Sequence, residues 1–572
     1  MKTLRIQLSL ILSLLSFNCA LPNSQTTPKL TIIMVVDQFA YHYFYKLRPF
    51  FTGAFKLLLN EGIVFDNAHY PHAVPETSIG HTALNTGVYA KDHGIIGNSW
   101  MDQSGKEVEC DDADAKTAAV FGKGCEMHTY GKSSAHIMVD GLSDQFAMQS
   151  QSDTPFLAFS ISMKSRSAIA TATKLGKAIW FDKETGLFTS SKAYFEQLPP
   201  WLINFNTKNK IDCVKEVTWD LVYPKTSPAY QFKYIDNYKY ASEKEASVNK
   251  QKTINCCTSD HKEIYAPIYE SPFGNTLLLN LARECLKANL TKKNKLLLWV
   301  CLTPLDLVGH HYGPDSLEAI DLIYHLDKQI KSFMQDVQSK VGKNNVVFAL
   351  TADHGILPMQ GIIQEEGLKT AYKIPVNQVM KDLNSMIQKK YSIDSFIIDY
   401  QPPQFFLDYK KKKQLDANAW NEIAKEIKEY LFTKPGIKNV WTYQELDILP
   451  LNPQQQELEY YFKNQRYPGR SGDIFVQTQP YSLLTAYDNG TSHASPYNYD
   501  THVPLFIYQK GKYERKKVTK KVYMTQFANT MAQILDIPKP SASTEQLLPG
   551  VFEEVEEEED DAEVKNTPII KR

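Results

Sequence analysis

The sequence lacks a long hydrophobic run beyond its N-terminal segment. After Leu8–Phe17, no segment reaches the roughly 18 uninterrupted apolar residues that indicate a membrane-spanning helix. An excess of one charge is also missing, because 63 basic and 64 acidic residues give a formal net charge of −1. A nucleic-acid binder usually carries a basic patch or stripe. We therefore expect neither a stable membrane span nor a nucleic-acid partner.

Cysteines at the spacing of a zinc-thiolate site are absent as well. The chain contains eight cysteines but no Cys-x-x-Cys motif, which argues against a structural zinc site built from thiolates. Cys285 and Cys301 fall in apolar patterns and are expected in the core. In an exported protein, Cys110 and Cys125 are the simplest pair to form a disulfide.

The N-terminus has the pattern of an export signal. Lys2 and Arg5 precede the apolar run Leu8–Phe17, as in the n-region and h-region of a signal peptide. We therefore predict a signal peptide over residues 1–20 and a periplasmic or secreted protein. Lipid attachment at Cys19 is the alternative, although the preceding Ser-Phe-Asn departs from the usual small-residue pattern.

The C-terminus is strongly acidic. Glu553–Glu563 contains nine acidic residues and no basic residue. Such a block is usually solvated and disordered, so residues 551–572 are predicted to be a disordered tail, with cation buffering or partner binding as the alternative. Between the two ends, residues 21–550 are predicted to form one catalytic domain.

Short apolar runs alternate with helical patterns along the chain. Uninterrupted apolar runs of this length are typical of strands that are buried on both faces of a parallel sheet. The four clearest runs are Leu30–Val36, Phe156–Ser162, Leu296–Leu302 and Val346–Leu350. Helical patterns lie at Gly53–Glu61, Asn275–Lys287 and Pro314–Val341. This alternation predicts an α/β fold with a mostly parallel central sheet and helices on both faces.

Two segments interrupt the alternation. Residues 200–272 are rich in Tyr, Lys, Asn and Trp without a clear period, and residues 385–472 contain one helical pattern at Ala417–Phe432. Predicted strands of one sheet flank each segment. We therefore predict two insertions that cap the strand ends, rather than independent domains.

Acidic and imidazole side chains gather at the ends of the predicted strands. In open α/β sheets, ligands bind at the carboxyl ends of the strands. The candidate metal ligands are Asp37, Asp306, His310, Asp353, His354 and His502. Asp306 and His310 are four residues apart and fall on one side of a helical turn. Because His311 follows directly, the sequence leaves open which of the two histidines is the ligand.

Three carboxylates and three imidazoles form a mixed oxygen and nitrogen set that suits zinc. Six ligands are too many for one tetrahedral site that keeps an open position, so they predict two sites of three ligands each. Two neighbouring metal ions suit phosphoryl or sulfuryl displacement, because one activates the attacking oxygen and the other steadies the leaving oxygen. The ligand types favour two zinc ions per chain and leave manganese and magnesium open.

A hydroxyl, an amide and two cations accompany the candidate ligands. Thr77 lies where a polar loop enters a predicted helix, and a helix N-terminus favours an anionic group such as phosphate. Metal coordination would activate this hydroxyl as a nucleophile. A glycine-punctuated turn is expected to bring Asn98 back beside it. Lys164 and Arg166 follow the strand Phe156–Ser162, where they would balance the charge of phosphoryl oxygens.

Together, these motifs resemble those of the alkaline phosphatase superfamily. The segments that carry the resemblance are Pro75–His81, Gly97–Asn98, Lys164–Arg166, Asp306–His310, Thr351–Gly355 and Asp500–Pro504. They occur in the family's order between about Leu30 and Ile537, and they look most like its single-chain bacterial phosphatases with a threonine nucleophile. One departure is Ile79, which stands where the pattern has a proline.

The resemblance implies a di-zinc active site. At the matching positions, one zinc binds the nucleophile Thr77 together with Asp37, Asp353 and His354. The other zinc binds Asp306, His310 and His502. The phosphoryl oxygens contact Asn98, Lys164 and Arg166. The chain is thus predicted to be an exported, monomeric phosphomonoesterase that hydrolyses small-molecule phosphate esters through a phosphothreonine intermediate.

Two alternatives remain. A nucleotide pyrophosphatase/phosphodiesterase would share the metal motifs, but that group lacks the pair matching Lys164 and Arg166. A catalytically silent binding protein is the second alternative, and the unbroken set of ligands argues against it. Sulfatases need a Cys/Ser-x-Pro-x-Arg segment, which Glu76–His81 does not provide. His93 is expected to be a packing residue, and Asp500 to start a turn.

Overall fold

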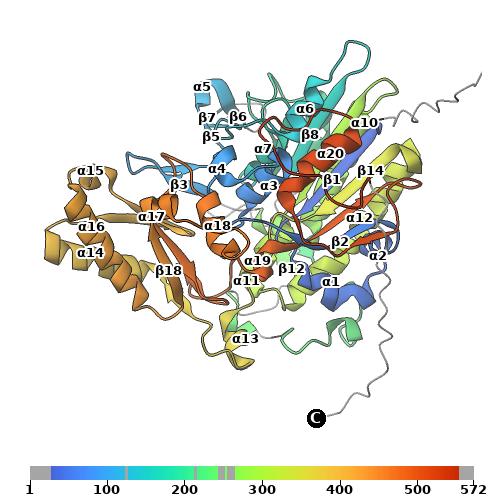
Figure 1. The fold of residues 1–572 in the computed structure, drawn as a ribbon. Coiled ribbons are helices and arrows are strands. Elements are labelled where there is room, and N and C mark those ends of the chain that lie inside the picture. Colours follow the sequence, from blue (N-terminus) through green and yellow to red (C-terminus); the bar gives the residue numbers. More distant parts are fainter. Residues whose placement is uncertain are drawn as a thin grey trace, which may run out of the picture.

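The computed structural model describes residues 27–122, 127–211, 216–236, 238–242, 251–253 and 265–552 (Figure 1). The predicted signal peptide, Cys19 and the acidic segment from residue 553 lie outside these ranges. None of the helices in the described ranges is both long enough and apolar enough to cross a membrane.

A ten-stranded sheet forms the centre of the molecule (Figure 1). Five adjacent strands are parallel, in the order β9 (Lys177–Asp182), β8 (Phe156–Ser162), β13 (Lys295–Leu302), β1 (Leu30–Val36) and β14 (Val346–Thr351). Next to β14, the sheet continues with the antiparallel β21 (His502–Tyr508) and then β2 (Ile63–His69). The edge strands are β10 (Leu187–Thr189), β22 (Lys516–Val518) and β23 (Val522–Tyr523). The predicted, mostly parallel sheet is confirmed.

Helices cover both faces of this sheet, and this explains why its strands are continuous apolar runs. All residues of β1 and β14 are buried. One layer contains α3 (Thr77–Thr86), α6 (Leu142–Met148), α7 (Ser165–Ala172) and α20 (Phe527–Leu535). The other contains α2 (Ala54–Glu61), α10 (Pro272–Asn289) and α12 (Leu317–Val341) (Figure 1). The long stripe of buried residues on α12 packs toward the sheet.

The second interruption of the α/β pattern, predicted at residues 385–472, forms a lobe beside the central sheet (Figure 1). At its base, β15 (Lys373–Pro375) pairs with β20 (Leu483–Thr485), so the lobe extends beyond residues 385–472 at both ends. Its antiparallel sheet has the order β16 (Ile397–Gln401), β17 (Gln404–Leu407), β19 (Ile474–Thr478) and β18 (Ile437–Thr442). The helices α14 (Val376–Tyr391) and α16 (Ala417–Phe432) pack on it around a separate hydrophobic core. The lobe also contains α15 (Tyr409–Lys412), α17 (Tyr443–Ile448) and α18 (Glu457–Asn464).

The described part of the first interruption, predicted at residues 200–272, packs on the helical layer around α12. Its described elements include α8 (Pro200–Lys208), η3 (Pro228–Tyr230), η4 (Tyr238–Tyr240) and α9 (Ala266–Tyr269). The Trp219 indole donates to the buried Asp321 carboxylate of α12 at 2.6 Å, and the Tyr230 hydroxyl donates to the same carboxylate. The Ser242 amide donates to the His311 carbonyl at 2.9 Å, so this segment reaches the helix that follows β13.

Residues 90–132 form a smaller region next to α3. It contains α4 (Ala90–His93), α5 (Ala115–Ala118), the hairpin of β3 (Ser99–Met101) and β4 (Glu107–Glu109), and a sheet of β5 (Asp112–Ala113), β7 (Met127–Lys132) and β6 (Ala119–Phe121). Cys110, Cys285 and Cys301 are buried free thiols. Cys110 is therefore not half of a disulfide among the described residues, and its expected partner Cys125 lies outside them.

Candidate active site

Three neighbouring parallel strands deliver the candidate ligands to one edge of the sheet. Val36 at the end of β1 lies opposite Leu302 at the end of β13, and Val35 lies opposite Thr351 at the end of β14. Because the three strands end in register, the residues that follow them meet. These residues are Asp37 after β1, Asp353 and His354 after β14, and Asp306 and His310 on α11 (Pro304–Tyr312) after β13.

Asp37, Asp353 and His354 form the first candidate metal-binding group, and all three are buried. The His354 Nε2 lies 3.3 Å from the Asp37 Oδ1 and 3.6 Å from the Asp353 Oδ2. The His354 Nδ1 contacts the Gly355 carbonyl at 2.9 Å, which turns Nε2 toward the two carboxylates. These three facing atoms have no hydrogen-bond partner among the described residues. Buried lone pairs in this state suit a bound cation.

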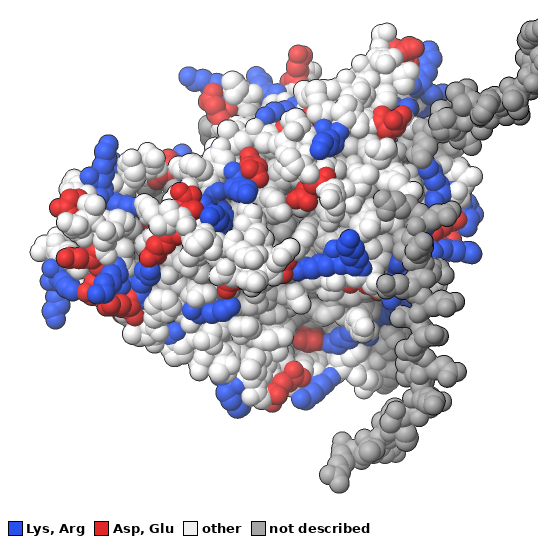
Figure 2. Space-filling model, viewed as in Figure 1, with Lys and Arg blue, Asp and Glu red and all other residues white. Residues whose placement is uncertain are grey.

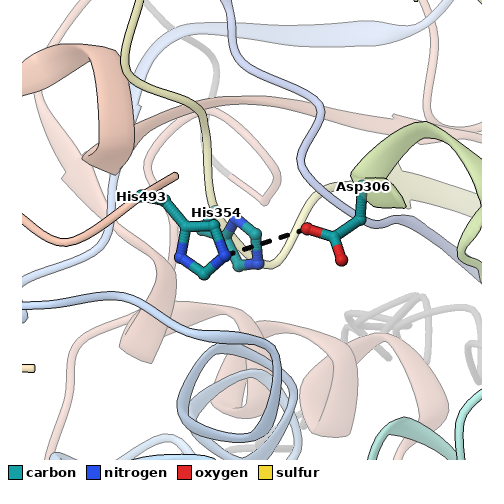
Figure 3. Close-up of side chains that lie close together, drawn as sticks. All are labelled: Asp306, His354 and His493. Carbon is teal, nitrogen blue, oxygen red and sulfur yellow. Dashed lines mark ion pairs between the residues drawn. The ribbon is translucent and has the colours of Figure 1, made fainter. Parts of the chain in front are cut away.

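Asp306, His354 and His493 form the second group (Figure 3). The His493 ring stacks on the His354 ring with centroids 3.6 Å apart, and its Nε2 lies 3.8 Å from the Asp306 Oδ1. His310 adds a third imidazole, with its Nε2 3.2 Å from the same Asp306 oxygen. The Nδ1 atoms of His310 and His493 contact backbone carbonyls, at 2.8 Å and 2.9 Å, so both rings present Nε2 to Asp306.

His310, rather than its neighbour, faces the site. The His311 Nδ1 lies 3.8 Å from the Glu270 carboxylate instead. Of the two histidines, His310 therefore lies against Asp306 and His311 against Glu270.

His502 does not join either group, which corrects the sequence-based ligand set. As the first residue of β21, it pairs with His69 of β2. Its ring stacks on Tyr41 and on His69, with centroids 4.2 Å and 4.4 Å away, and its Nε2 contacts the Asp66 carbonyl at 2.8 Å. The position beside Asp306 belongs to His493, in the loop before α19 (Asn498–Thr501). The loop has no periodicity, so its only signal in the sequence is a histidine nine residues before His502.

Thr77 begins α3 at the edge of the first group. A Cβ on Gly80, one turn later, would lie 2.2 Å from the Asp353 carbonyl oxygen, so only glycine lets the helix approach this closely. His81 also joins the helix to the group, with its Nδ1 2.8 Å from the Thr77 carbonyl and 3.2 Å from the Asp353 Oδ2.

Asn98 lies beside the start of the same helix, as the glycine-punctuated turn predicted. Its Oδ1 accepts a hydrogen bond from the Ser78 backbone amide at 3.1 Å, and its backbone N–H donates to the Glu76 carboxylate at 2.7 Å. Because Oδ1 is engaged, the side-chain NH₂ group remains as a donor beside Thr77.

Lys164 connects the two groups with the threonine. Its Nζ lies 2.7 Å from Asp37, 2.6 Å from Asp306 and 3.3 Å from the Thr77 Oγ1. Arg166 follows in the first turn of α7 and is partly buried, but it forms no hydrogen bond or ion pair with any residue that the structure describes.

The electrostatics of the site favour a cation. Burial, followed by repulsion from Asp306 and Asp353, raises the pKa of Asp37 to about 6, although Lys164 opposes this. Burial also works against a charged His354, yet Asp353 and Asp37 raise its pKa to about 9. Three carboxylates in so small a volume require positive charge nearby.

Two candidate metal-binding groups and a threonine thus lie together at the strand ends of an α/β sheet, an arrangement that suits a hydrolase. The chain belongs to the type I phosphodiesterase / nucleotide pyrophosphatase family, whose profile matches residues 31–504. It is therefore a hydrolase that acts on phosphoric ester bonds.

Among similar proteins, alkaline phosphatase PhoV of Synechococcus elongatus is 29% identical over 538 residues, covering 91% of this chain and 92% of PhoV. Alkaline phosphatase PafA of Elizabethkingia meningoseptica is 29% identical over 543 residues, covering 91% of this chain and 94% of PafA. The crystal structure of wild-type alkaline phosphatase PafA matches with a TM-score of 0.79 and 27% identity, covering 92% of this chain and 99% of that chain. The resemblance to the alkaline phosphatase superfamily is confirmed.

Proposed function

We propose that this protein is a metal-dependent phosphomonoesterase whose Thr77 carries the phosphoryl group during the reaction. The observation that carries this proposal is the position of Lys164, whose ammonium contacts Asp37, Asp306 and the Thr77 hydroxyl at once. A cation at this point can bind the oxygens of a phosphoryl group that reaches Thr77. The names of the relatives PhoV and PafA support the same class of reaction.

The donor atoms fit two zinc ions, each bound by oxygen and nitrogen ligands. Asp37, Asp353 and His354 would hold one ion beside Thr77, since their facing atoms are buried and lack hydrogen-bond partners in the described part of the chain. The second ion would be held by Asp306, His310 and His493. When bound, two such ions stabilise negative charge on the attacking and leaving oxygens.

The residues of the chain itself supply the nucleophile and the contacts to phosphate. The Thr77 hydroxyl gives up its proton to solvent and its oxygen attacks phosphorus. The bond to the ester oxygen breaks, and the alcohol leaves with a proton from solvent. Lys164 and Arg166 balance the charge of the phosphoryl oxygens, and the Asn98 NH₂ group donates to one of them. Water then attacks the phosphothreonine, which releases inorganic phosphate and restores the hydroxyl. Dividing the displacement in this way makes each step easier.

Thr77→Ala tests the nucleophile. The variant is expected to keep its zinc and its melting temperature but to lose nearly all turnover of an aryl phosphate monoester. Acid quenching of the wild type during turnover should give phosphothreonine at residue 77 by mass spectrometry. Thr82→Ala is the matched control, because that buried hydroxyl lies on the same helix and donates to the Ser78 carbonyl. Full turnover in Thr77→Ala would exclude the assigned nucleophile.

A phosphodiesterase is the second candidate function, favoured by the description of the matching family. Lys164 and Arg166 supply two positive charges, which suit the dianion of a monoester better than the single charge of a diester. Replacing both by alanine is expected to lower kcat/KM for an aryl phosphate monoester on the order of 10²–10³-fold, and far less for the matching methyl diester. A wild-type enzyme that prefers the diester would reverse the assignment.

We also propose export, with cleavage after the predicted signal peptide, and a monomeric enzyme that acts on small phosphate esters. The basic and apolar pattern of the first 20 residues supports export. The mass of the mature chain from a periplasmic extract, with and without lipid extraction, would separate cleavage after residue 20 from lipid attachment at Cys19.

A further inference from the structure

A buried glutamine of the lobe contacts the loop that leads to Thr77. Gln465 directly follows α18, and its exposed fraction is 0%. Its Oε1 accepts a hydrogen bond from the Val74 N–H at 2.8 Å, and its Nε2 donates to the Val74 carbonyl at 3.2 Å. The carboxamide thus pairs with both backbone polar groups of Val74, which lies three residues before the candidate nucleophile.

The same carboxamide also reaches the turn that carries Asn98. The Gln465 Nε2 donates a second hydrogen bond to the Ile96 carbonyl, at 3.2 Å. Closer to the candidate nucleophile, Asn98 itself contacts Ser78 and Glu76. Gln465 therefore adds a further connection at the base of the two segments, and this connection comes from the lobe.

The helix before Gln465 packs on the same loop. The Gln465 N–H donates to the Tyr461 carbonyl of α18 at 3.1 Å. Tyr461 and Phe462 belong to one hydrophobic cluster with Ala73, the residue before Val74. Because the helix and the loop share this cluster, the carboxamide is held in place relative to the Val74 backbone.

A second lobe residue fixes the other end of the turn before Asn98. The Arg470 Nη1 donates to the Gly94 carbonyl at 2.6 Å and to the His136 carbonyl at 2.7 Å, and its guanidinium lies over the Trp100 ring. Gly94 has a φ of +83°, a conformation that favours glycine. The turn from Gly94 to Ile96 is thus held by the lobe at both ends.

We propose that Gln465 is a positioning residue through which the lobe sets the spacing between Thr77 and Asn98. By fixing the backbones of Val74 and Ile96, it allows the Thr77 hydroxyl and the Asn98 NH₂ group to reach one phosphoryl group. A displacement of about 1 Å in such an arrangement can cost on the order of 10²-fold in rate. The inference rests on the proposed function, in which Thr77 receives the phosphoryl group and Asn98 binds it.

A double-mutant cycle tests this role. Gln465→Met keeps most of the side-chain volume but removes the hydrogen bonds to Val74 and Ile96. It is combined with Asn98→Ala, and kcat/KM for an aryl phosphate monoester and inhibition by inorganic phosphate are measured. We expect Gln465→Met to lower kcat/KM and to weaken phosphate inhibition by roughly 10-fold. In the Asn98→Ala background, the same change should cost at most about twofold.

Gln404→Met is the matched control. Gln404 is another buried glutamine of the lobe, and its Oε1 accepts a hydrogen bond from the Gly472 N–H at 2.7 Å, within the lobe itself. This variant should also lower the melting temperature, because it leaves a buried N–H without its partner. It should leave kcat/KM and phosphate inhibition unchanged, since it breaks no contact between the lobe and the segments before Thr77 and Asn98.

The contrary outcomes are distinct. Equal losses from Gln465→Met in both backgrounds would show that the residue does not act through Asn98, and an unchanged kcat/KM would show that it does not position the site at all. If Gln465→Met does not fold, Gln465→Glu takes its place in the cycle, because a carboxylate still accepts from the Val74 N–H but cannot donate to Ile96. A wild-type enzyme without monoesterase activity would instead overturn the proposed function.

Discussion

At the scale of single residues, His354 is the shared member of the site. It belongs to both candidate metal-binding groups, lies 3.3 Å from Asp37 and stacks on His493. In the metal-free protein, burial and the positive charge of His354 hold the pKa of His493 well below its ordinary value. His493 is therefore a neutral imidazole, which is the form that binds a metal ion.

The position of His493, rather than His502, beside Asp306 gives the first prediction. His493→Ala is expected to lower bound zinc from about two to about one ion per chain and to remove most turnover, because Asp306 and His310 alone leave the second ion with two protein ligands. His502→Ala is the matched variant and should keep both ions and near-normal turnover. Metal analysis by mass spectrometry, together with kcat, checks this. Two ions in His493→Ala and one in His502→Ala would restore the ligand set expected from the sequence.

The reason the sequence pointed to His502 is physical. Asp37, Asp353 and His354 directly follow buried strands, so their place at the sheet edge follows from the strand pattern alone. His493 follows no strand, and its ring is oriented by the carbonyl of Pro75, more than 400 residues away in the chain. Long-range contacts of that kind leave no local periodicity.

At the scale of elements, the central sheet follows from local sequence patterns, whereas most of the lobe depends on long-range contacts. The buried strands Leu30–Val36 and Phe156–Ser162 have the bounds that their apolar runs predicted. In the lobe, α16 was the one helix predicted, from its local amphipathic pattern. The central strand Ile474–Thr478 pairs with strands that lie roughly 30 and 70 residues earlier, and no pattern within the strand specifies such partners.

The contact between the lobe and the central sheet gives the second prediction. The Glu457 Oε1 of α18 accepts hydrogen bonds from Lys521 and from the Tyr523 hydroxyl of β23, both at 2.5 Å, and from Tyr461 at 2.6 Å. Burial opposes the charge of Glu457, but these bonds lower its pKa to about 2. The stabilisation is complete above the ordinary value of 4.5 and is lost as the pH falls from 4.5 toward 2.

Glu457→Gln is therefore expected to lower the melting temperature at pH 7 by roughly 1–2 °C, a modest effect because the side chain is partly exposed to solvent. The difference from the wild type should shrink at pH 3. Calorimetry at both pH values checks it. Glu459→Gln is the control on the same helix, where the carboxylate contacts Lys438 within the lobe. A difference that grows toward acid pH would mean that Glu457 does not carry a lowered pKa in the folded protein.

At the scale of the whole molecule, the charge is arranged very differently outside and inside. On the face shown in Figure 2, basic and acidic side chains are interspersed, in keeping with a formal net charge of −1. The centre, by contrast, buries Asp37, Asp306 and Asp353 together, with the ammonium of Lys164 beside two of them. Folding this interior is costly unless further positive charge is bound there.

Metal removal gives the third prediction. Chelation is expected to lower the melting temperature, and zinc should restore it, since an ion at 100 times its Kd stabilises the folded state by about 2.7 kcal/mol per site.

In the metal-free protein, burial raises the pKa of Asp37 from 3.8 to about 6. A carboxylate with a raised pKa costs stability as the pH climbs through that window, because the folded state then releases protons later than the unfolded chain. The gap between the zinc-loaded and metal-free melting temperatures should therefore widen from pH 4 to pH 7. His502→Ala should respond as the wild type does, while His493→Ala should show a smaller gap at every pH. A gap that narrows toward pH 7, or a melting temperature that does not respond to chelation, would mean that these buried carboxylates are compensated by the protein alone.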